Sequence, residues 1–363
     1  MPPESILLQF LSGSVETELI DDPATCELLL RQARSTNLLS RVAVLCVEKN
    51  LTPRLPQRMQ NHLQSAQAVA MANHRSVKWE TKQLERALAI GKIPFCLLKG
   101  GAYVVGRSVA AKGRVFSDVD ILVPKERLDE TERLLIESGW MCTNFDPYDQ
   151  RYYRSWMHEL PPLQHLKRGT TLDVHHAIIP PTARIKSDID KFWECAHKVA
   201  KRELLYVPGD QDLILHSAVH LFCDGELENG LRDLSDLDLL LRDSSVSDDF
   251  WSGLLARAVV LNLQRPLFYA LRYCHVLLQT PVPVQVLDVA TQGSPGKWSV
   301  KWMDFLFCRA LAPDHISCND RWTGLARWIL FVRSHWLRMP PLQLAQHLAR
   351  KGYKRWKKRR ASA

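Results

Sequence analysis

The sequence lacks any apolar run that is long enough to cross a membrane. The best candidate, Trp328–Val332, has only five residues, whereas a membrane-spanning helix needs about 20. The first residues also lack the basic segment of a secretory signal. We therefore expect a soluble, cytoplasmic protein.

Cysteine is present but shows no pattern. None of the nine cysteines forms a C-x-x-C pair, and several lie inside apolar runs, as Cys96 does in Phe-Cys-Leu-Leu. This scatter argues against both a zinc knuckle and a disulfide framework. We expect reduced, buried thiols, which agrees with a cytoplasmic location.

Net positive charge is concentrated in one segment. The whole chain carries a net charge of +9, but residues 350–360 hold eight basic and no acidic residues, which leaves +1 for the rest. The main body therefore lacks the basic surface of a nucleic-acid-binding protein. Only the tail offers weak contact with RNA or an anionic membrane.

What is present is an ordinary globular composition, with 46% hydrophobic and 24% charged residues. The patterns predict a small mixed sheet between two helical regions, an α/β (α+β) fold. The predicted domains are an N-terminal helical region (1–92), a sheet core (93–187), a C-terminal helical region (188–349) and a basic tail (350–363).

Apolar residues recur at helical spacing over residues 26–47 and 59–90, which predicts helices there. Pro53 and Pro56 separate the two stretches. Another amphipathic helix is predicted over 126–138, ended by Gly139. Short apolar or alternating runs predict strands at 95–98, 118–123, 140–145, 152–157, 163–166 and 171–175.

The most informative motif is Asp118-Val119-Asp120, at the start of an apolar strand. Alternate residues of a strand face the same side, so both carboxylates project together. Two like charges at close range are unfavourable unless a cation neutralises them, and Mg²⁺ prefers such oxygen ligands. An exposed strand start with unrelated acids would be the simpler interpretation of this motif alone.

Two further motifs support a metal–phosphate site. Upstream, Leu98-Lys99-Gly100-Gly101 ends a strand in two glycines before a helix, where backbone N–H groups can approach phosphates. No Gly-Lys-Ser/Thr follows, so this is not a Walker P-loop. Downstream, Asp173 and His175 share one face of a later strand, and Asp173 supplies a third carboxylate.

These residues resemble the nucleotidyltransferase superfamily related to DNA polymerase β. The motifs L-K-G-x-A (98–102), R-x-x-S-D-h-D (114–120), L-D-h-H (172–175) and H-x-x-x-H…L-R-x-x-x-D (216–236) look like an uncharacterised group of nucleotidyltransferase family proteins from bacterial biosynthetic clusters. The resemblance covers about 26–241. Sixteen residues separate Gly101 from Asp118, more than is usual in the superfamily, and 108–116 absorb them.

The resemblance implies transfer of a nucleoside monophosphate from an NTP, such as ATP, to a hydroxyl or phosphate of a small-molecule or biosynthetic-intermediate acceptor. Two Mg²⁺ ions, or Mn²⁺ in their place, would bind Asp118, Asp120 and Asp173, and Asp173 would also activate the nucleophile. Gly100, Gly101 and Ser117 would contact the triphosphate. Lys99 and Arg114 would neutralise phosphoryl charge, with a solvated strand-end charge as the alternative for Lys99. From its position alone, His175 either orients Asp173 or is a polar residue at the end of its strand.

Several alternatives stay open. The chain can instead be a non-catalytic module that binds RNA, a membrane or a partner protein, or it can transfer the nucleotide to a protein side chain. His216 and His220 are four residues apart on a helix, and packing is the favoured role over metal binding. Asp233 and Asp238 are expected to face solvent, with Arg232 pairing with Asp236. The Trp- and Arg-rich segment 321–338 is interpreted as a core helix, with a nucleic-acid stacking surface or an interfacial helix as the alternatives.

Overall fold

The computed structural model describes residues 5–14, 21–224, 227–244, 249–340, 344–345 and 350. The predicted basic tail, 350–363, lies outside the described residues apart from Arg350. No helix among the described residues has both the length and the apolar character that a bilayer crossing requires.

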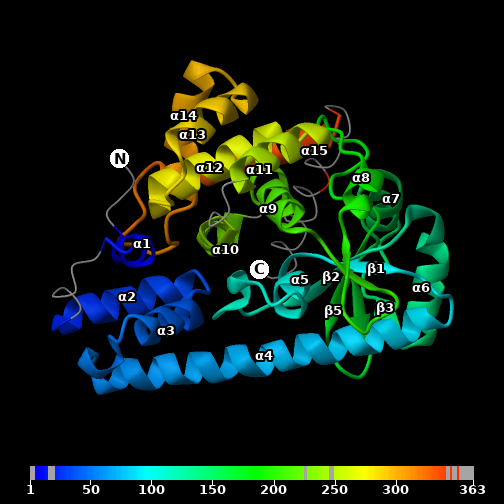
Figure 1. The fold of residues 1–363 in the computed structure, drawn as a ribbon, viewed down its shortest axis with the longest axis horizontal. Coiled ribbons are helices and arrows are strands. Elements are labelled where there is room, and N and C mark those ends of the chain that lie inside the picture. Colours follow the sequence, from blue (N-terminus) through cyan, green and yellow to red (C-terminus); the bar gives the residue numbers. More distant parts are fainter. Residues whose placement is uncertain are drawn as a thin grey trace, which may run out of the picture.

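A seven-stranded mixed sheet forms one end of the molecule (Figure 1). Its strands lie in the order β3-β4-β5-β2-β1-β7-β6. At its centre β2 pairs in parallel with β5 and antiparallel with β1. The strand bounds are β1 Phe95–Leu97, β2 Asp118–Leu122, β3 Trp140–Cys142, β4 Leu163–His165, β5 Thr171–His175, β6 His197–Lys198 and β7 Leu205–Val207.

The N-terminal region is helical, as predicted. Its helices are α1 Ile6–Ser12, α2 Pro23–Ser35, α3 Leu39–Glu48 and α4 Gln57–Ala89. The single helix predicted over 26–47 is two helices, because Asn37 between them has a φ of +56° and cannot continue a helix. Helix α4 has 33 residues, about 50 Å at 1.5 Å per residue. It runs from beside α2 and α3 to the sheet (Figure 1).

The sheet region carries the helices α5 Lys99–Val105, α6 Leu128–Glu137, α7 Pro147–Trp156 and α8 Ile189–Glu194. The strand predicted over 152–157 is wrong, because these residues form the end of α7 and the turn after it. Asp146 accepts hydrogen bonds from the N–H groups of Tyr148 and Asp149, and Pro147 occupies the first turn. These are strong helix-start signals, and they outweigh the strand preference of the aromatic residues that follow.

The C-terminal region holds α9 Asp210–Val219, α10 Gly230–Ser244, α11 Phe250–Val260, α12 Gln264–Leu278, α13 Val284–Ala290, α14 Lys297–Ala310 and α15 Thr323–Arg338. The prediction of helix alone after residue 188 missed β6 and β7. Strand β7 pairs in parallel with β1, so the sheet continues beyond the predicted core. The domain boundaries themselves stay a prediction.

Helix α15 packs against α14 and only one of its faces is buried. Ala326, Leu330 and Ser334 lie on that face. Trp322, Trp328 and Trp336 are instead 41%, 61% and 44% exposed. Segment 321–338 therefore packs as a helix against the rest of the protein, as predicted. Its three tryptophans, however, do not belong to the core.

A continuous hydrophobic core joins the N-terminal helices, the sheet and the C-terminal helices. Helices α9 and α10 pack against each other and against α12, and α5 contacts α9. In Figure 1, α9 and α10 lie between the sheet and the outer C-terminal helices. This packing places the start of β2 and the second half of β5 opposite α9 and α10.

Candidate active site

A cavity of about 290 Å³ lies where β2, β5 and the start of α5 face α9 and α10. Segments far apart in the sequence contribute to it, from α5 to the end of α15. Most of the side chains around it are polar or charged, and they include Lys99, Arg114, Ser117, Asp118, Asp120, Tyr153, His158, Glu159, Asp173, His175, His220, Arg232, Asp233, Asp236 and Arg338.

The three predicted carboxylates meet in this cavity. Strands β2 and β5 are parallel, with Asp120 directly opposite Asp173 and Asp118 opposite Thr171. Since in-register residues of neighbouring strands face the same side, Asp118, Asp120 and Asp173 project together. Asp120 is buried, whereas Asp118 and Asp173 are half-buried. The two motifs, more than 50 residues apart, thus form one acidic floor.

The three carboxyl groups have different pKa values because their surroundings differ. Burial alone would raise the pKa of Asp120, but the Lys99 ammonium and a hydrogen bond from His175 hold it well below its ordinary value. Burial, and then the charges of Asp120 and Glu159, raise the pKa of Asp173 to about 8. Burial and Asp120 also raise the pKa of Asp118. Asp173 therefore needs a proton or a cation beside it at neutral pH.

The donor set fits a divalent cation with a preference for oxygen. The buried Oδ1 of Asp173 accepts no hydrogen bond from any residue that the structure describes. Buried polar atoms are rarely left in that condition without a partner such as an ion or water. Mg²⁺ takes such carboxylate oxygens together with substrate phosphates. The three residues are thus suited to hold the metal ions that the sequence motif predicts.

Lys99 begins helix α5 and reaches into the acidic floor. Its Nζ lies 2.9 Å from Oδ1 of Asp120, and its side chain is 24% exposed. Its backbone has a φ of +41°, a left-handed conformation that costs energy for a residue other than glycine. The strained backbone directs a flexible cation toward the predicted metal ligands.

The two glycines after Lys99 have different surroundings. Gly100 lines the cavity, and a Cβ there would come within 2.0 Å of the Phe116 ring. Gly101 is buried against Leu97 behind the cavity wall. Ser117 lies at the cavity and donates a hydrogen bond to Asp118. Of the residues predicted to contact a triphosphate, Gly100 and Ser117 line the cavity, whereas Gly101 supports the turn from behind.

Arg114 lies in the cavity wall but is tied to two carboxylates. Its Nε is 2.7 Å from Asp236 and its Nη2 is 2.9 Å from Asp233, and its side chain is only 9% exposed. Arg41 of α3 also pairs with Asp236, at 2.9 Å. The Arg41 guanidinium also donates hydrogen bonds to the backbone carbonyls of Lys112 and Ala110, so it anchors the loop that precedes β2.

This network corrects the expectation for helix α10. Asp233 and Asp238 do not face solvent: Asp233 binds Arg114 and Arg232, and Asp238 accepts hydrogen bonds from Thr280 and Arg242. Arg232 pairs with Asp233 rather than with Asp236. Helical spacing alone suggested the i, i+4 pair of Arg232 and Asp236. In the structure, Arg41 and Arg114 from other elements pair with Asp236 instead.

His216 of α9 and His220, which directly follows that helix, do not come together as metal ligands. His216 is buried and packs edge-on against Phe192, and burial first of all lowers its pKa to about 3. His220 lies in the cavity wall, with Nε2 4.0 Å from Asp233. It begins a π-helical turn, a distortion often found at functional sites. The packing role thus suits His216, and His220 belongs to the cavity.

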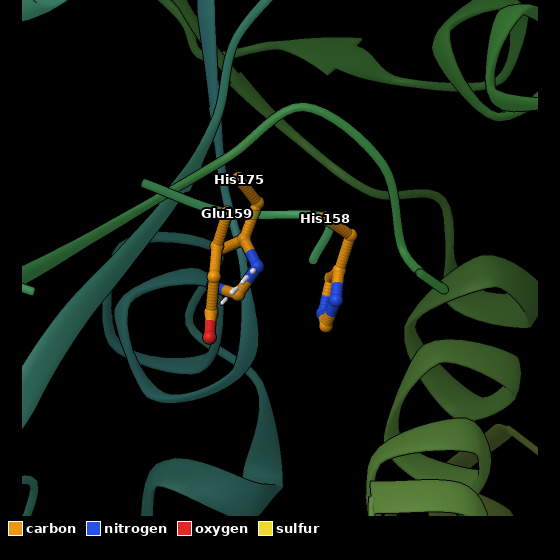
Figure 2. A group of neighbouring side chains, drawn as sticks. All are labelled: His158, Glu159 and His175. Carbon is orange, nitrogen blue, oxygen red and sulfur yellow. Dashed lines mark ion pairs between the residues drawn. The ribbon is translucent and has the colours of Figure 1, made fainter. Parts of the chain in front are cut away.

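The sequence analysis missed the residues that complete the cavity opposite α9. Tyr153, His158 and Glu159 come from α7 and the segment between it and β4, and Arg338 ends α15. Glu159 forms a bridge with His175 beside the end of β5. Figure 2 shows the side chains of His158, Glu159 and His175 extending in the same direction. The adjacent His-Glu pair before two prolines was the available signal, but only the strand pairing brings it to β5.

No curated protein matches the chain. Residues 22–279, more than half of the chain, match the protein family described as "Uncharacterised nucleotidyltransferase". This range contains each of the motifs that carried the resemblance, and it extends beyond the span expected from them. The chain therefore belongs to this nucleotidyltransferase family.

Proposed function

We propose that the protein is a Mg²⁺-dependent enzyme that transfers a nucleoside monophosphate from an NTP to a hydroxyl or phosphate of a small-molecule or biosynthetic-intermediate acceptor. The observation that carries the proposal is the register of β2 and β5, which gathers Asp118, Asp120 and Asp173 on the floor of one cavity. Family membership supports nucleotidyl transfer in general.

In this proposal Asp118 and Asp120 hold two Mg²⁺ ions, with Mn²⁺ as a substitute, and Asp173 completes one of the two sites. Bound metal ions would neutralise the triphosphate and lower the pKa of an attacking hydroxyl. Asp173 would also accept the proton of that hydroxyl. His175 donates to Asp120 at 3.1 Å and thereby fixes the orientation of that ligand.

The triphosphate would lie against the start of α5. Gly100 and Ser117 line this part of the cavity, and the Lys99 side chain, 24% exposed, is accessible to a ligand there. When metal ions bind Asp120, the Lys99 ammonium can turn from that carboxylate to a phosphate oxygen. Arg114 contributes positive charge from the wall while it stays paired with Asp233 and Asp236. ATP is the first donor to test.

A small acceptor is favoured over nucleic acid by the charge of the cavity. Its lining contains six carboxylates, namely Asp118, Asp120, Glu159, Asp173, Asp233 and Asp236, against the four cations Lys99, Arg114, Arg232 and Arg338. A nucleic acid would gain little there, because its affinity depends on many phosphates neutralised by Lys and Arg, whereas the Mg²⁺ ions would neutralise the triphosphate. The volume is also close to that of small-molecule pockets, about 300 Å³ at the lower end.

The test is a thermal-shift titration with ATP, GTP, CTP and UTP, each with and without Mg²⁺. A ligand at about 100 times its Kd stabilises the folded state by about 2.7 kcal/mol. We expect one nucleotide to raise the unfolding temperature only when Mg²⁺ is present. The double variant Asp118→Asn/Asp120→Asn should lose that shift.

The matched control is Asp288→Asn, which changes an exposed carboxylate that does not line the cavity. This variant should keep the full shift. Mass shifts on co-expressed proteins would redirect the acceptor to a protein side chain. Absence of a shift with all four nucleotides would contradict nucleotide binding by the free protein and favour a non-catalytic binding module of the same fold.

A further inference from the structure

We propose that His158, Glu159 and His175 bind a divalent transition-metal ion, with zinc as the ion that fits best, at a site separate from the three carboxylates. Ligand atoms of these residues lie within 4.8 Å of one another, and all three residues line the cavity. Figure 2 shows their side chains extending in the same direction. The inference rests on these side chains and does not require nucleotidyl transfer.

The orientation of His175 is the first supporting observation. Its Nε2 lies 3.1 Å from Oδ1 of Asp120, which fixes a proton on that nitrogen. In the neutral ring its Nδ1 is an acceptor, and this buried atom makes no hydrogen bond with any described residue. A metal-binding histidine typically donates its other N–H to a carboxylate in this way. Asp120 would thus support His175 as a ligand without binding the same ion.

The spacing of His175 and Glu159 is the second observation. Nδ1 of His175 and Oε2 of Glu159 are 3.5 Å apart, and both atoms accept hydrogen bonds when His175 is neutral. Two ligand atoms on a tetrahedral zinc ion at about 2.0 Å are about 3.3 Å apart. A cation between the two atoms would therefore require little movement. Glu159 is 18% exposed, which leaves its carboxylate room to adjust.

The chemistry of the third ligand selects the class of ion. His158 is buried, and its ring centroid lies 5.2 Å from that of His175. Two imidazoles with one carboxylate favour Zn²⁺ and similar ions, whereas Mg²⁺ favours oxygen ligands alone. Three protein ligands leave the fourth position open, which is typical of catalytic rather than structural zinc. Because the three residues line the cavity, water within it could supply the fourth ligand.

The experiment titrates the full-length, chelator-treated protein with Zn²⁺ alone, without nucleotide, and follows binding by calorimetry. Co²⁺ is then substituted, because its visible absorption reports coordination of four or five ligands. We expect one ion per chain and clear Co²⁺ absorption bands. His158→Ala and Glu159→Gln should each weaken binding at least tenfold and remove the bands.

Two controls separate this site from its neighbours. Asp118→Asn alters the carboxylate floor and His62→Ala removes an exposed histidine of α4, and both should bind Zn²⁺ as the wild type does. Glu159→Gln preserves side-chain size, and its unfolding temperature verifies that it folds. Loss of binding in Asp118→Asn with retention in His158→Ala and Glu159→Gln would place the ion on the carboxylates and overturn the proposal. Absence of saturable binding in the wild type would also overturn it, whatever the nucleotide titration shows.

Discussion

Lys99 combines a strained backbone with an ion pair at the predicted metal ligands. Its φ is +41°, and its ammonium lies 2.9 Å from Asp120. Strain of this kind persists where the surrounding structure enforces it, and it concentrates at functional sites. Since a metal ion would compete for the same carboxylate, Lys99 is placed to exchange Asp120 for a phosphate.

Replacing Lys99 by Met should weaken NTP binding about tenfold, which corresponds to about 1.4 kcal/mol and to the loss of one charge-assisted contact. Calorimetric titration of the nucleotide identified by the thermal shift measures this change. Lys125→Met, an exposed lysine that does not line the cavity, serves as the control. Equal affinity of Lys99→Met and wild type would show that Lys99 only neutralises Asp120.

His216 should make stability depend on pH. Burial lowers its pKa to about 3 in the folded chain, against an ordinary value of 6.5. Between these values the unfolded chain binds a proton that the folded chain does not, so the free energy of unfolding falls as the pH drops below 6.5. From pH 7 to pH 5 this histidine should account for a loss of about 2 kcal/mol.

Urea unfolding of wild type and His216→Leu at both pH values tests this expectation. The variant should lose less stability on acidification, by about that amount. His62→Leu changes an exposed histidine of the same type and should follow the wild type. A variant that is as sensitive to pH as the wild type would mean that other groups govern acid stability.

The acidic floor was predictable because its pattern is local. Asp118 and Asp120 alternate on one strand, and Asp173 follows the same alternation on another. Glu159 and Arg41 were not predictable, because nothing near them in the sequence specifies their partners. Glu159 reaches the site through its β-bridge with His175. Arg41 reaches it through an ion pair with Asp236, which is far away in the sequence.

At the scale of elements, the buried charges of α3, α10 and the loop before β2 hold the cavity wall. Asp236 is the centre of this network, because it receives both Arg41 and Arg114 and is 3% exposed. Removing one partner of a buried ion pair leaves the other charge uncompensated, which typically costs about 3–5 kcal/mol.

Asp236→Asn should therefore lower the free energy of unfolding by about 3 kcal/mol or more. Denaturant unfolding followed by circular dichroism provides the measurement. Glu137→Gln breaks the exposed pair with Arg133, whose side chains are 53% and 59% exposed, and should change stability by less than about 1 kcal/mol. Similar effects of the two variants would contradict a structural role for the network.

Elements with one strong local signal were predicted correctly, and those decided by neighbours were not. β1, β2 and β5 are apolar runs that fill the sheet centre, and α4 has an uninterrupted helical pattern. β6 has only two residues, both exposed, and exists because β7 lies beside it. Its sequence therefore carries no strand signal of its own.

At the scale of the molecule, the continuous core makes thiol reactivity a measure of folding. The described structure contains no disulfide among the nine cysteines, and Cys195 is exposed. Burial raises the pKa of the Cys46 thiol to about 12 and that of Cys308 to about 11. Because the thiolate is the reactive form, such groups react slowly at neutral pH even when a reagent reaches them.

Ellman's reagent at pH 8 should therefore modify about one thiol per native chain rapidly, and this fast phase should be absent from Cys195→Ser. In denaturant all nine cysteines should react, because the chain holds them as free thiols. The slow native phase reports opening of the core, so its rate should fall when a nucleotide stabilises the folded state. Rapid modification of several native thiols would show that the N-terminal helices, the sheet and the C-terminal helices open independently rather than as one packed unit.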